Sequence, residues 1–183
     1  MCCKKNRGEV ARGSAWALVT GAAVGIGREY AERLAELGYN LYLDDIRKEI
    51  IEEAMAIEHH HRVKCVPKVL DLSEVGAARR LHATTTDEGY EFDVVVNNAG
   101  IFSFCDILNT PLERIEHLLQ LHDVTLTTMC RLYGEDMVKR GKGRLLNMSS
   151  YSIWILDMDK SYIRNVPLAG IIHFDHGKVM PVD

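Results

Sequence analysis

Three glycines at positions 21, 25 and 27 stand between an apolar run, residues 15–19, and a segment with helical periodicity. A strand that turns at once into a helix leaves the first N–H groups of that helix unpaired, with the positive end of the helix dipole behind them. Because glycine has no Cβ, a phosphate group can approach such a backbone closely. The spacing therefore predicts a diphosphate site, and the alternative is a plain glycine turn of an α/β protein.

Two further motifs follow in the chain. Asn97-Asn98-Ala99-Gly100 comes directly after residues 92–96, an apolar run typical of a strand buried on both faces of a parallel sheet. Later, residues 143–150 form a second strand-like segment that ends in Ser149-Ser150. Taken alone, the asparagine motif has the alternative of an ordinary Asn-Gly turn.

With Thr20 in front of the glycines, these three segments, in this order, resemble those of the short-chain dehydrogenases/reductases. The resemblance covers most of the chain and ends near Trp154. It implies an α/β fold of the Rossmann type, a doubly wound parallel sheet that is incomplete at its C-terminal end. It also implies NAD(P)-dependent hydride transfer between nicotinamide and a small-molecule alcohol or ketone. A methyltransferase or other nucleotide-binding protein on the same fold is disfavoured by the asparagine motif.

The resemblance also implies which positions contact the cofactor. In this family the glycine loop holds the diphosphate, the ends of the second and third strands hold the adenosine, and the asparagine motif leaves room for the dinucleotide. The positions that match are Thr20, Gly21, Gly25, Ile26, Gly27, Asp45, Arg47, Asp71, Leu72, Asn98, Ala99 and Gly100.

Asp45 is the position that chooses between NAD and NADP in this interpretation. It lies a little over twenty residues beyond the first glycine, where a Rossmann unit meets the adenosine ribose. A carboxylate there accepts hydrogen bonds from ribose hydroxyls and repels a 2′-phosphate by about 1–3 kcal/mol. We therefore expect NAD rather than NADP. Arg47 would soften this preference, unless it is an ordinary surface residue of the following helix.

Asp71 has two interpretations that do not exclude each other. The resemblance gives it a role in holding the adenine ring. Its position at the end of a strand also suits a turn residue that leads to Ser73, which we expect to be a helix N-cap.

The catalytic residues match the family less well. Hydride transfer needs a proton to move to or from the substrate oxygen. The family uses a serine, which falls on Ser150 with Ser149 as the alternative, and a helix asparagine, at whose position we assign Asp123. Asp123 is a departure from the family pattern.

The family's tyrosine, with a lysine four residues later, is not found. At the corresponding spacing from Ser150 this chain has Ile163 and Pro167. The neighbouring candidate is Tyr162, but the residue four positions beyond it is Val166. The second hypothesis is therefore a dinucleotide-binding fragment or pseudoenzyme without catalysis.

We expect three segments: a flexible lead (1–13), a dinucleotide-binding domain (14–154) and a divergent tail (155–183). The tail has no clear helical or strand period, so we interpret it as the product of a truncation or frameshift in a full-length ancestor. A sheet cut after its fifth strand would leave that strand as an exposed edge.

Periodicity and end signals predict the elements within the domain. The third strand contains Pro67, which cannot donate to a ladder, and so should lie at an edge. Thr110 and Pro111 should begin a long helix that Gly141 ends, with apolar residues on much of its surface, which suggests a homo-oligomer contact through residues 111–140. The expected strands are 15–19, 41–43, 63–70, 92–96 and 143–150, and the expected helices 28–37, 48–61, 74–83 and 110–140.

Composition narrows the remaining possibilities. A net charge of −4 over 183 residues gives no basic footprint for nucleic acid, and no apolar run is long enough for a membrane span. The five cysteines form no CxxC pair, which favours a reducing, cytoplasmic location. Three adjacent histidines, residues 59–61, do not have metal-ligand spacing, so we expect no metal site.

Overall fold

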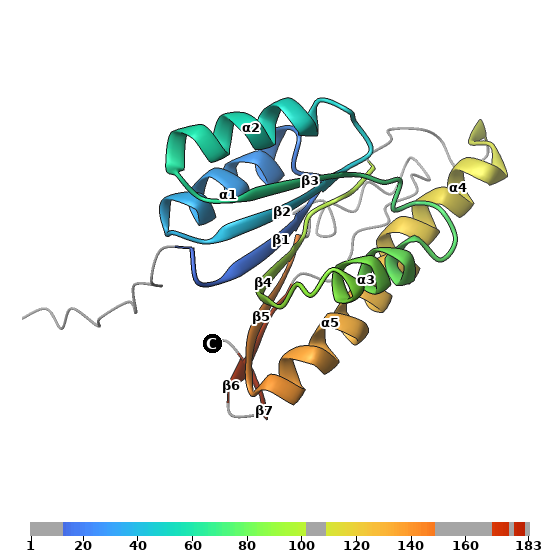
Figure 1. The fold of residues 1–183 in the computed structure, drawn as a ribbon. Helices are drawn as coiled ribbons and strands as arrows, with labels where there is room; N and C mark the ends of the chain where they lie inside the picture. Colours follow the sequence, from blue (N-terminus) through green and yellow to red (C-terminus); the bar gives the residue numbers. More distant parts are fainter. Residues whose placement is uncertain (1–12, 102–108, 149–169, 176–177, 182–183) are drawn as a thin grey trace, which may run out of the picture.

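The computed structural model describes residues 13–101, 109–148, 170–175 and 178–181. These residues form one seven-stranded sheet in the order β3-β2-β1-β4-β5-β6-β7, with helices on both faces (Figure 1). The first five strands in chain order pair in parallel, and the last two are antiparallel. The strands are β1 (Trp16–Thr20), β2 (Asn40–Asp45), β3 (Cys65–Val69), β4 (Phe92–Asn97), β5 (Lys142–Asn147), β6 (Gly170–Asp175) and β7 (Lys178–Pro181).

The helices connect the parallel strands and cover the two faces. Figure 1 shows α1 and α2 on one face of the sheet and α3, α4 and α5 on the other. They are α1 (Gly25–Glu36), α2 (Ile50–His61), α3 (Ala77–Asp87), α4 (Leu112–Leu119) and α5 (Leu126–Arg140), with a π-helical segment η2 (Gln120–Thr125) between the last two.

Alternation along β1 divides the core into two layers. Ala17 and Val19 are fully buried among residues of α1 and α2, whereas Leu18 is fully buried on the other face with residues of α3 and α5. Successive strand residues point to opposite faces, so a strand covered on both sides is apolar throughout. The sequence therefore predicted the parallel sheet correctly, including the edge position of β3 with its Pro67.

Several element boundaries differ from the predicted ones. Helix α1 begins at Gly25 rather than near Arg28, so the end of the glycine loop is already the first helical turn. Ser73 is not an N-cap, because α3 begins at Ala77 with Gly76 before it. The amide and hydroxyl of Ser73 instead donate to Asp71 Oδ1, at 2.8 and 2.6 Å.

The long helix predicted after Thr110 is interrupted. Pro111 occupies its N-cap position, the first helical residue is Leu112, and no side chain caps this end. Residues 120–125 are π-helical, which divides α4 from α5, and the helix ends at Gly141 in a left-handed conformation, as predicted. A π-helical turn inside an α-helix is frequent at functional sites.

The expectation of an exposed edge at β5 is wrong. Strand β6 pairs antiparallel with β5 along its full length, from Lys142 opposite Asp175 to Asn147 opposite Gly170. Strand β7 then becomes the edge. It is only four residues long and ends in Pro181, which has no N–H to offer a further strand. Residues 170–181 show no clear strand period, so these two strands were not predicted from the sequence.

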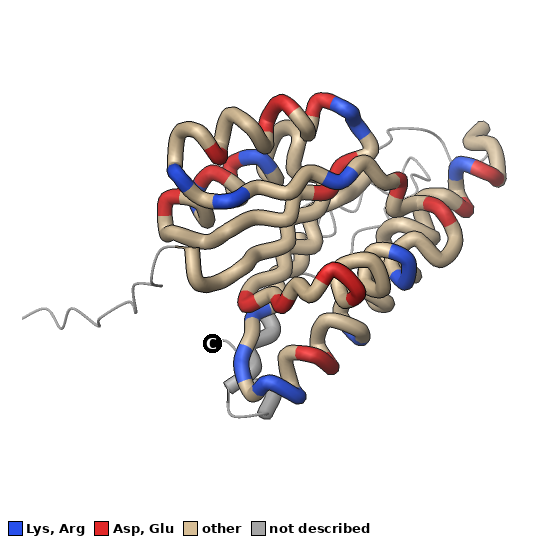
Figure 2. The backbone as a smooth tube through the Cα atoms, in the orientation of Figure 1, with Lys and Arg blue, Asp and Glu red and all other residues tan. Residues whose placement is uncertain are grey.

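Charged residues of both signs lie along α1 and α5 (Figure 2). On α5, for example, Glu135 lies between Arg131 and Lys139, one turn away on either side, and pairs with both. Hydrogen bonds from Lys139 and Arg131 hold the pKa of Glu135 below its ordinary value. In the residues that the structure describes, no helix is long and apolar enough to cross a membrane.

Candidate functional site

The glycine loop connects the carboxyl end of β1 to the first turn of α1. Gly21 and Gly25 have left-handed backbones, with φ of 65° and 62°, which side chains other than glycine rarely adopt. Around a Cβ built on Gly25 nothing lies within 4 Å, so the space above this residue is open. Val24 precedes the helix in an extended conformation, and no side chain caps the helix. The amino end of α1 therefore has no side-chain cap that would compete with a diphosphate.

Gly27 is required for a different reason, which is packing. A Cβ at this position would lie 2.1 Å from the carbonyl oxygen of Gly21 and 2.4 Å from Asn98 Nδ2. Ile26, between these two glycines, is 59% exposed beside the loop. The glycine spacing thus combines free space for a ligand at Gly25 with close contact of helix and strand at Gly27.

The hydroxyl of Thr20 joins the glycine loop to the asparagine motif. Its Oγ1 accepts hydrogen bonds from the backbone N–H groups of Asn98 and Ala99, both at 3.0 Å. It also lies 3.3 Å from the carbonyl oxygen of Val96, to which it donates. This single buried side chain, 2% exposed, therefore fixes the end of β4 against the end of β1.

The two asparagines connect β4 to its neighbours, as the resemblance implied. Asn98 Nδ2 donates to the carbonyl oxygens of Thr20 and Gly21, at 3.0 Å each. Asn97 Nδ2 donates to Asn147 Oδ1 on β5, at 2.8 Å. The motif thus cross-links three parallel strands at the edge where their carboxyl ends meet, which is where ligands bind in doubly wound sheets.

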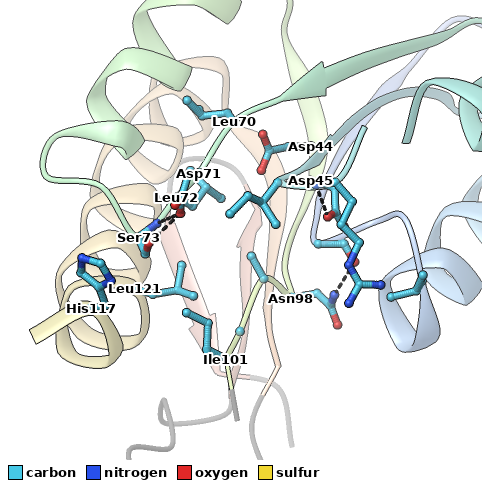
Figure 3. Close-up of a pocket in the computed structure, with 16 residues that line it drawn as sticks. Asp44, Asp45, Leu70, Asp71, Leu72, Ser73, Asn98, Ile101, His117 and Leu121 are labelled. Atoms are coloured by element: carbon cyan, nitrogen blue, oxygen red, sulfur yellow. Dashed lines mark hydrogen bonds between the residues drawn. The ribbon is translucent and has the colours of Figure 1, made fainter. Parts of the chain in front are cut away.

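A pocket of about 430 Å³ lies at this edge (Figure 3). Its volume falls within the range of small-molecule sites. Most of the predicted cofactor residues line it, together with residues of the helical segments and the end of β2. The lining residues are Gly21, Val24, Asp44, Asp45, Ile46, Arg47, Leu70, Asp71, Leu72, Ser73, Asn98, Ala99, Gly100, Ile101, His117 and Leu121.

Asp45 lies where the pocket meets the glycine loop. Its Oδ2 accepts a hydrogen bond from the N–H of Ala23, and its Oδ1 accepts one from the N–H of Arg47, both at 2.9 Å. The side chain is therefore fixed against the loop and is 6% exposed. Arg47 is exposed. A carboxylate oxygen can accept more than one hydrogen bond, so Asp45 retains acceptor capacity towards the pocket.

The helix position assigned to Asp123 lies in η2, next to His122. Asp123 is exposed, whereas its neighbour His122 is buried at 8% exposure against Gly100 and Ile101. His122 Nε2 lies 3.1 Å from the amide nitrogen and 2.9 Å from the carbonyl oxygen of Ile101. His122 is thus the side chain that η2 directs towards the end of β4. Helical spacing could have predicted that His122 is buried, because it is four residues after Leu118, which is also buried.

The remaining predicted catalytic residues, Ser149, Ser150 and Tyr162, lie outside the described residues. Within the described part of the chain, no group of three or more His, Cys, Asp or Glu side chains is arranged to hold a metal ion. Of the three adjacent histidines, His61 contacts Glu32 on α1, with Nε2 and Oε2 2.5 Å apart. This histidine therefore contributes to helix packing.

Comparison with known proteins decides the family. Residues 15–153 match the short chain dehydrogenase family. The chain belongs to the short-chain dehydrogenase family. Its curated relatives include the very-long-chain 3-oxoacyl-CoA reductase-B of Danio rerio, 34% identical over 142 residues that cover 75% of this chain and 45% of the relative. Another is "Probable oxidoreductase EphD" of Mycobacterium tuberculosis, 33% identical over 137 residues, 74% of this chain and 23% of the relative.

Solved structures of dehydrogenases agree with this fold. An alcohol dehydrogenase of Comamonas testosteroni specific for bulky-bulky ketones is 26% identical with a TM-score of 0.71, covering 76% of this chain and 56% of that one. A short-chain dehydrogenase of Sphingobium yanoikuyae in complex with NADPH is 27% identical with a TM-score of 0.70, covering 75% and 54%. The chain thus spans between 23% and 56% of the length of these four proteins.

Proposed function

We propose that this short-chain dehydrogenase binds a nicotinamide dinucleotide at the pocket and acts as an oxidoreductase on a hydroxyl or carbonyl group of a small molecule. The observation that carries the proposal is the open backbone above Gly25 at the uncapped start of α1. The diphosphate would lie there, and the adenosine would extend towards Asp45 and Leu72 in the pocket. The nicotinamide would extend past Gly100, with Ser150 polarising the substrate oxygen.

A matched pair of glycine variants tests the diphosphate site. Gly25 and Gly89 both have left-handed backbones, with φ of 62° and 80°, and open space around a built Cβ. Gly89 precedes β4, at the end of the sheet opposite the pocket. Gly25→Ala should weaken NADH binding by about tenfold or more, about 1.4 kcal/mol, whereas Gly89→Ala should leave it unchanged. Energy transfer from Trp16 to bound NADH provides the readout. Equal NADH affinities of the two variants would contradict a diphosphate site at Gly25.

Turnover is measured separately, with a panel of alcohols and ketones and both dinucleotides. Oxidation or reduction that Ser150→Ala abolishes is the expected result of the proposal. NADH binding without turnover of any substrate would instead support the alternative, a dinucleotide-binding chain that lacks the family's Tyr–Lys proton route. The substrate and the direction of the reaction are for this assay to identify.

We further propose that NAD is preferred over NADP, because the fixed carboxylate of Asp45 borders the pocket. NADPH should bind about tenfold more weakly than NADH, and Asp45→Asn should reduce that ratio, because the charge facing the 2′-phosphate is removed. The ratio is the appropriate measurement, since any loss of support for the glycine loop affects both dinucleotides alike. Arg47→Ala is the control: if its guanidinium binds the 2′-phosphate, NADPH binding alone weakens. Tighter binding of NADPH by the wild type would contradict the preference.

Two other expectations remain predictions. An assembly of identical subunits through residues 111–140 is supported by apolar side chains exposed along this segment, Leu112, Leu119 and Val124. A reducing, cytoplasmic location is supported by the free thiols of Cys65 and Cys130.

A further inference from the structure

The side chain of Asp44 forms part of the pocket wall and has no hydrogen-bond partner for one of its oxygens. Asp44 is 1% exposed, and its Oδ1 is buried without a partner among the residues that the structure describes. Asp45, the next residue, differs because each of its oxygens accepts a backbone N–H. Protein interiors rarely leave a carboxyl oxygen without a hydrogen-bond partner. The unpaired Oδ1 of Asp44 is therefore available to a ligand in the pocket.

Strand geometry directs Asp44 to the part of the pocket beyond the ribose. Successive residues of β2 point to opposite faces of the sheet, so Asp45 faces α1 while Asp44 faces the same side as Tyr42 and Leu72. Figure 3 shows Asp44 beside Leu70, across the pocket from Leu121. If the diphosphate lies at Gly25 and the ribose at Asp45, the base lies between these apolar side chains and next to the Asp44 carboxyl.

The surroundings of Asp44 favour its neutral form. Burial raises the pKa of Asp44 well above its ordinary value, and the nearby carboxylates of Asp45 and Asp71 raise it further. The opposing charge is Lys68, which faces Asp44 from β3 and lowers the pKa by a smaller effect than burial. Two other titratable groups, Tyr42 and Tyr133, have pKa values raised by burial and are therefore neutral.

We infer that Asp44 is a base-recognition residue, whose neutral carboxyl group holds the adenine of the dinucleotide by donating one hydrogen bond and accepting another. A neutral carboxyl has one O–H donor and one free acceptor oxygen. Adenine offers the complementary pair, a ring-nitrogen acceptor beside the exocyclic N–H donor. The inference rests on the proposed function, because it assigns a role to this residue in the same dinucleotide site.

Two variants of matched size separate hydrogen bonding from packing. Asp44→Asn keeps a donor and an acceptor but cannot ionise, whereas Asp44→Leu fills a similar volume with neither. ADP-ribose, measured by calorimetry, is the probe, because it carries the adenosine and diphosphate without the nicotinamide. At about pH 6, Asp44→Leu should bind ADP-ribose about tenfold more weakly than Asp44→Asn. Equal affinities of these two variants would overturn the inference.

The pH dependence of the wild type gives a second test. Ionisation of Asp44 removes its donor, so the affinity of the wild type for ADP-ribose should fall relative to that of Asp44→Asn as the pH is raised. His117 also lines the pocket and is the same in both proteins, so any effect of this residue cancels in the ratio of affinities. A ratio that falls at no pH would overturn the inference.

The same measurements distinguish this inference from the proposed function. If the wild type and both variants bind neither NADH nor ADP-ribose, the proposed function fails and the inference fails with it. If all three bind both ligands with the same affinity and the same pH profile, the inference alone fails. A further experiment tests the wild type without any substitution. If the neutral carboxyl of Asp44 binds the base, ADP-ribose binding should be accompanied by proton uptake wherever Asp44 is ionised in the free protein. Calorimetry in buffers of different ionisation enthalpy measures this uptake, and its absence at every pH counts against the inference.

Discussion

Gly27→Ala should lower the stability of the protein by about 3 kcal/mol or more, because the added methyl group has no space. Its Cβ would lie 2.1 Å from the carbonyl oxygen of Gly21. That oxygen cannot move away easily, since it accepts a hydrogen bond from Asn98 Nδ2, itself only 2.4 Å from the same Cβ. For a chain of this length the expected fall in Tm is about 6–12 °C, measured by thermal unfolding. NADH binding should fall as well, because the first turn of α1 is displaced.

Gly25→Ala is the control for this effect on stability. It requires a left-handed backbone at a non-glycine residue, which costs about 1–2 kcal/mol, but its Cβ meets no atom within 4 Å. Gly27→Ala should therefore unfold at a clearly lower temperature than Gly25→Ala. Equal melting temperatures would mean that α1 can move away from β1 at little cost, and that close packing is not the reason for a glycine at 27.

The difference between these two glycines also shows what sequence patterns can predict. The spacing from Gly21 to Gly27 was sufficient to place a strand, a loop and a helix start, because only glycine permits such a turn. The pattern did not show which glycine has open space beside it and which packs closely against the rest of the protein. That depends on Asn98, 71 positions beyond Gly27 in the sequence, and on a contact that no local pattern contains.

The parallel sheet and the edge position of β3 could be predicted from local patterns. Each central strand is an apolar run because it is buried on both faces, and residues such as Pro67 restrict a strand to an edge. Antiparallel β6 and β7 were not predicted, since residues 170–181 show no clear strand period and the pairing of β6 with β5 joins segments that are distant in the sequence.

From the sequence we chose residues of the glycine loop and asparagine motif, several of which line the pocket, such as Gly21 and Asn98. We did not choose Asp44, which also lines the pocket, or His122, which packs against Gly100 and Ile101. Both are adjacent to residues that were chosen, Asp45 and Asp123. Asp45 and Asp123 were chosen because they match positions of the family pattern. The direction of a side chain depends instead on the period of its strand or helix. Applying the period of two to β2 would have separated Asp44 from Asp45, and the helical period would have favoured His122.

Thr20→Val should be the second strongly destabilising substitution, with a loss of about 2–4 kcal/mol. Valine has nearly the shape of threonine, so the packing of this buried position is kept and only the hydroxyl is lost. The N–H groups of Asn98 and Ala99 then have no acceptor from β1, and the carbonyl of Val96 loses its donor. The end of β4, which lines the pocket, should become less ordered, and NADH affinity should fall together with stability.

Thr20→Ser provides the matched control, because it keeps the hydroxyl and removes one methyl group, at a cost of about 1 kcal/mol. Chemical denaturation should rank the proteins as wild type, Thr20→Ser and Thr20→Val in order of decreasing stability, with NADH affinity retained in the serine variant. If the valine variant is as stable as the serine variant, the hydroxyl does not hold β4 to β1. The other side chain that connects the ends of β1 and β4 is Asn98, whose Nδ2 donates to the carbonyls of Thr20 and Gly21. In that case Asn98→Ala should be more destabilising than Thr20→Val. The ranking of the threonine and asparagine variants therefore identifies which of the two side chains aligns the glycine loop with the asparagine motif.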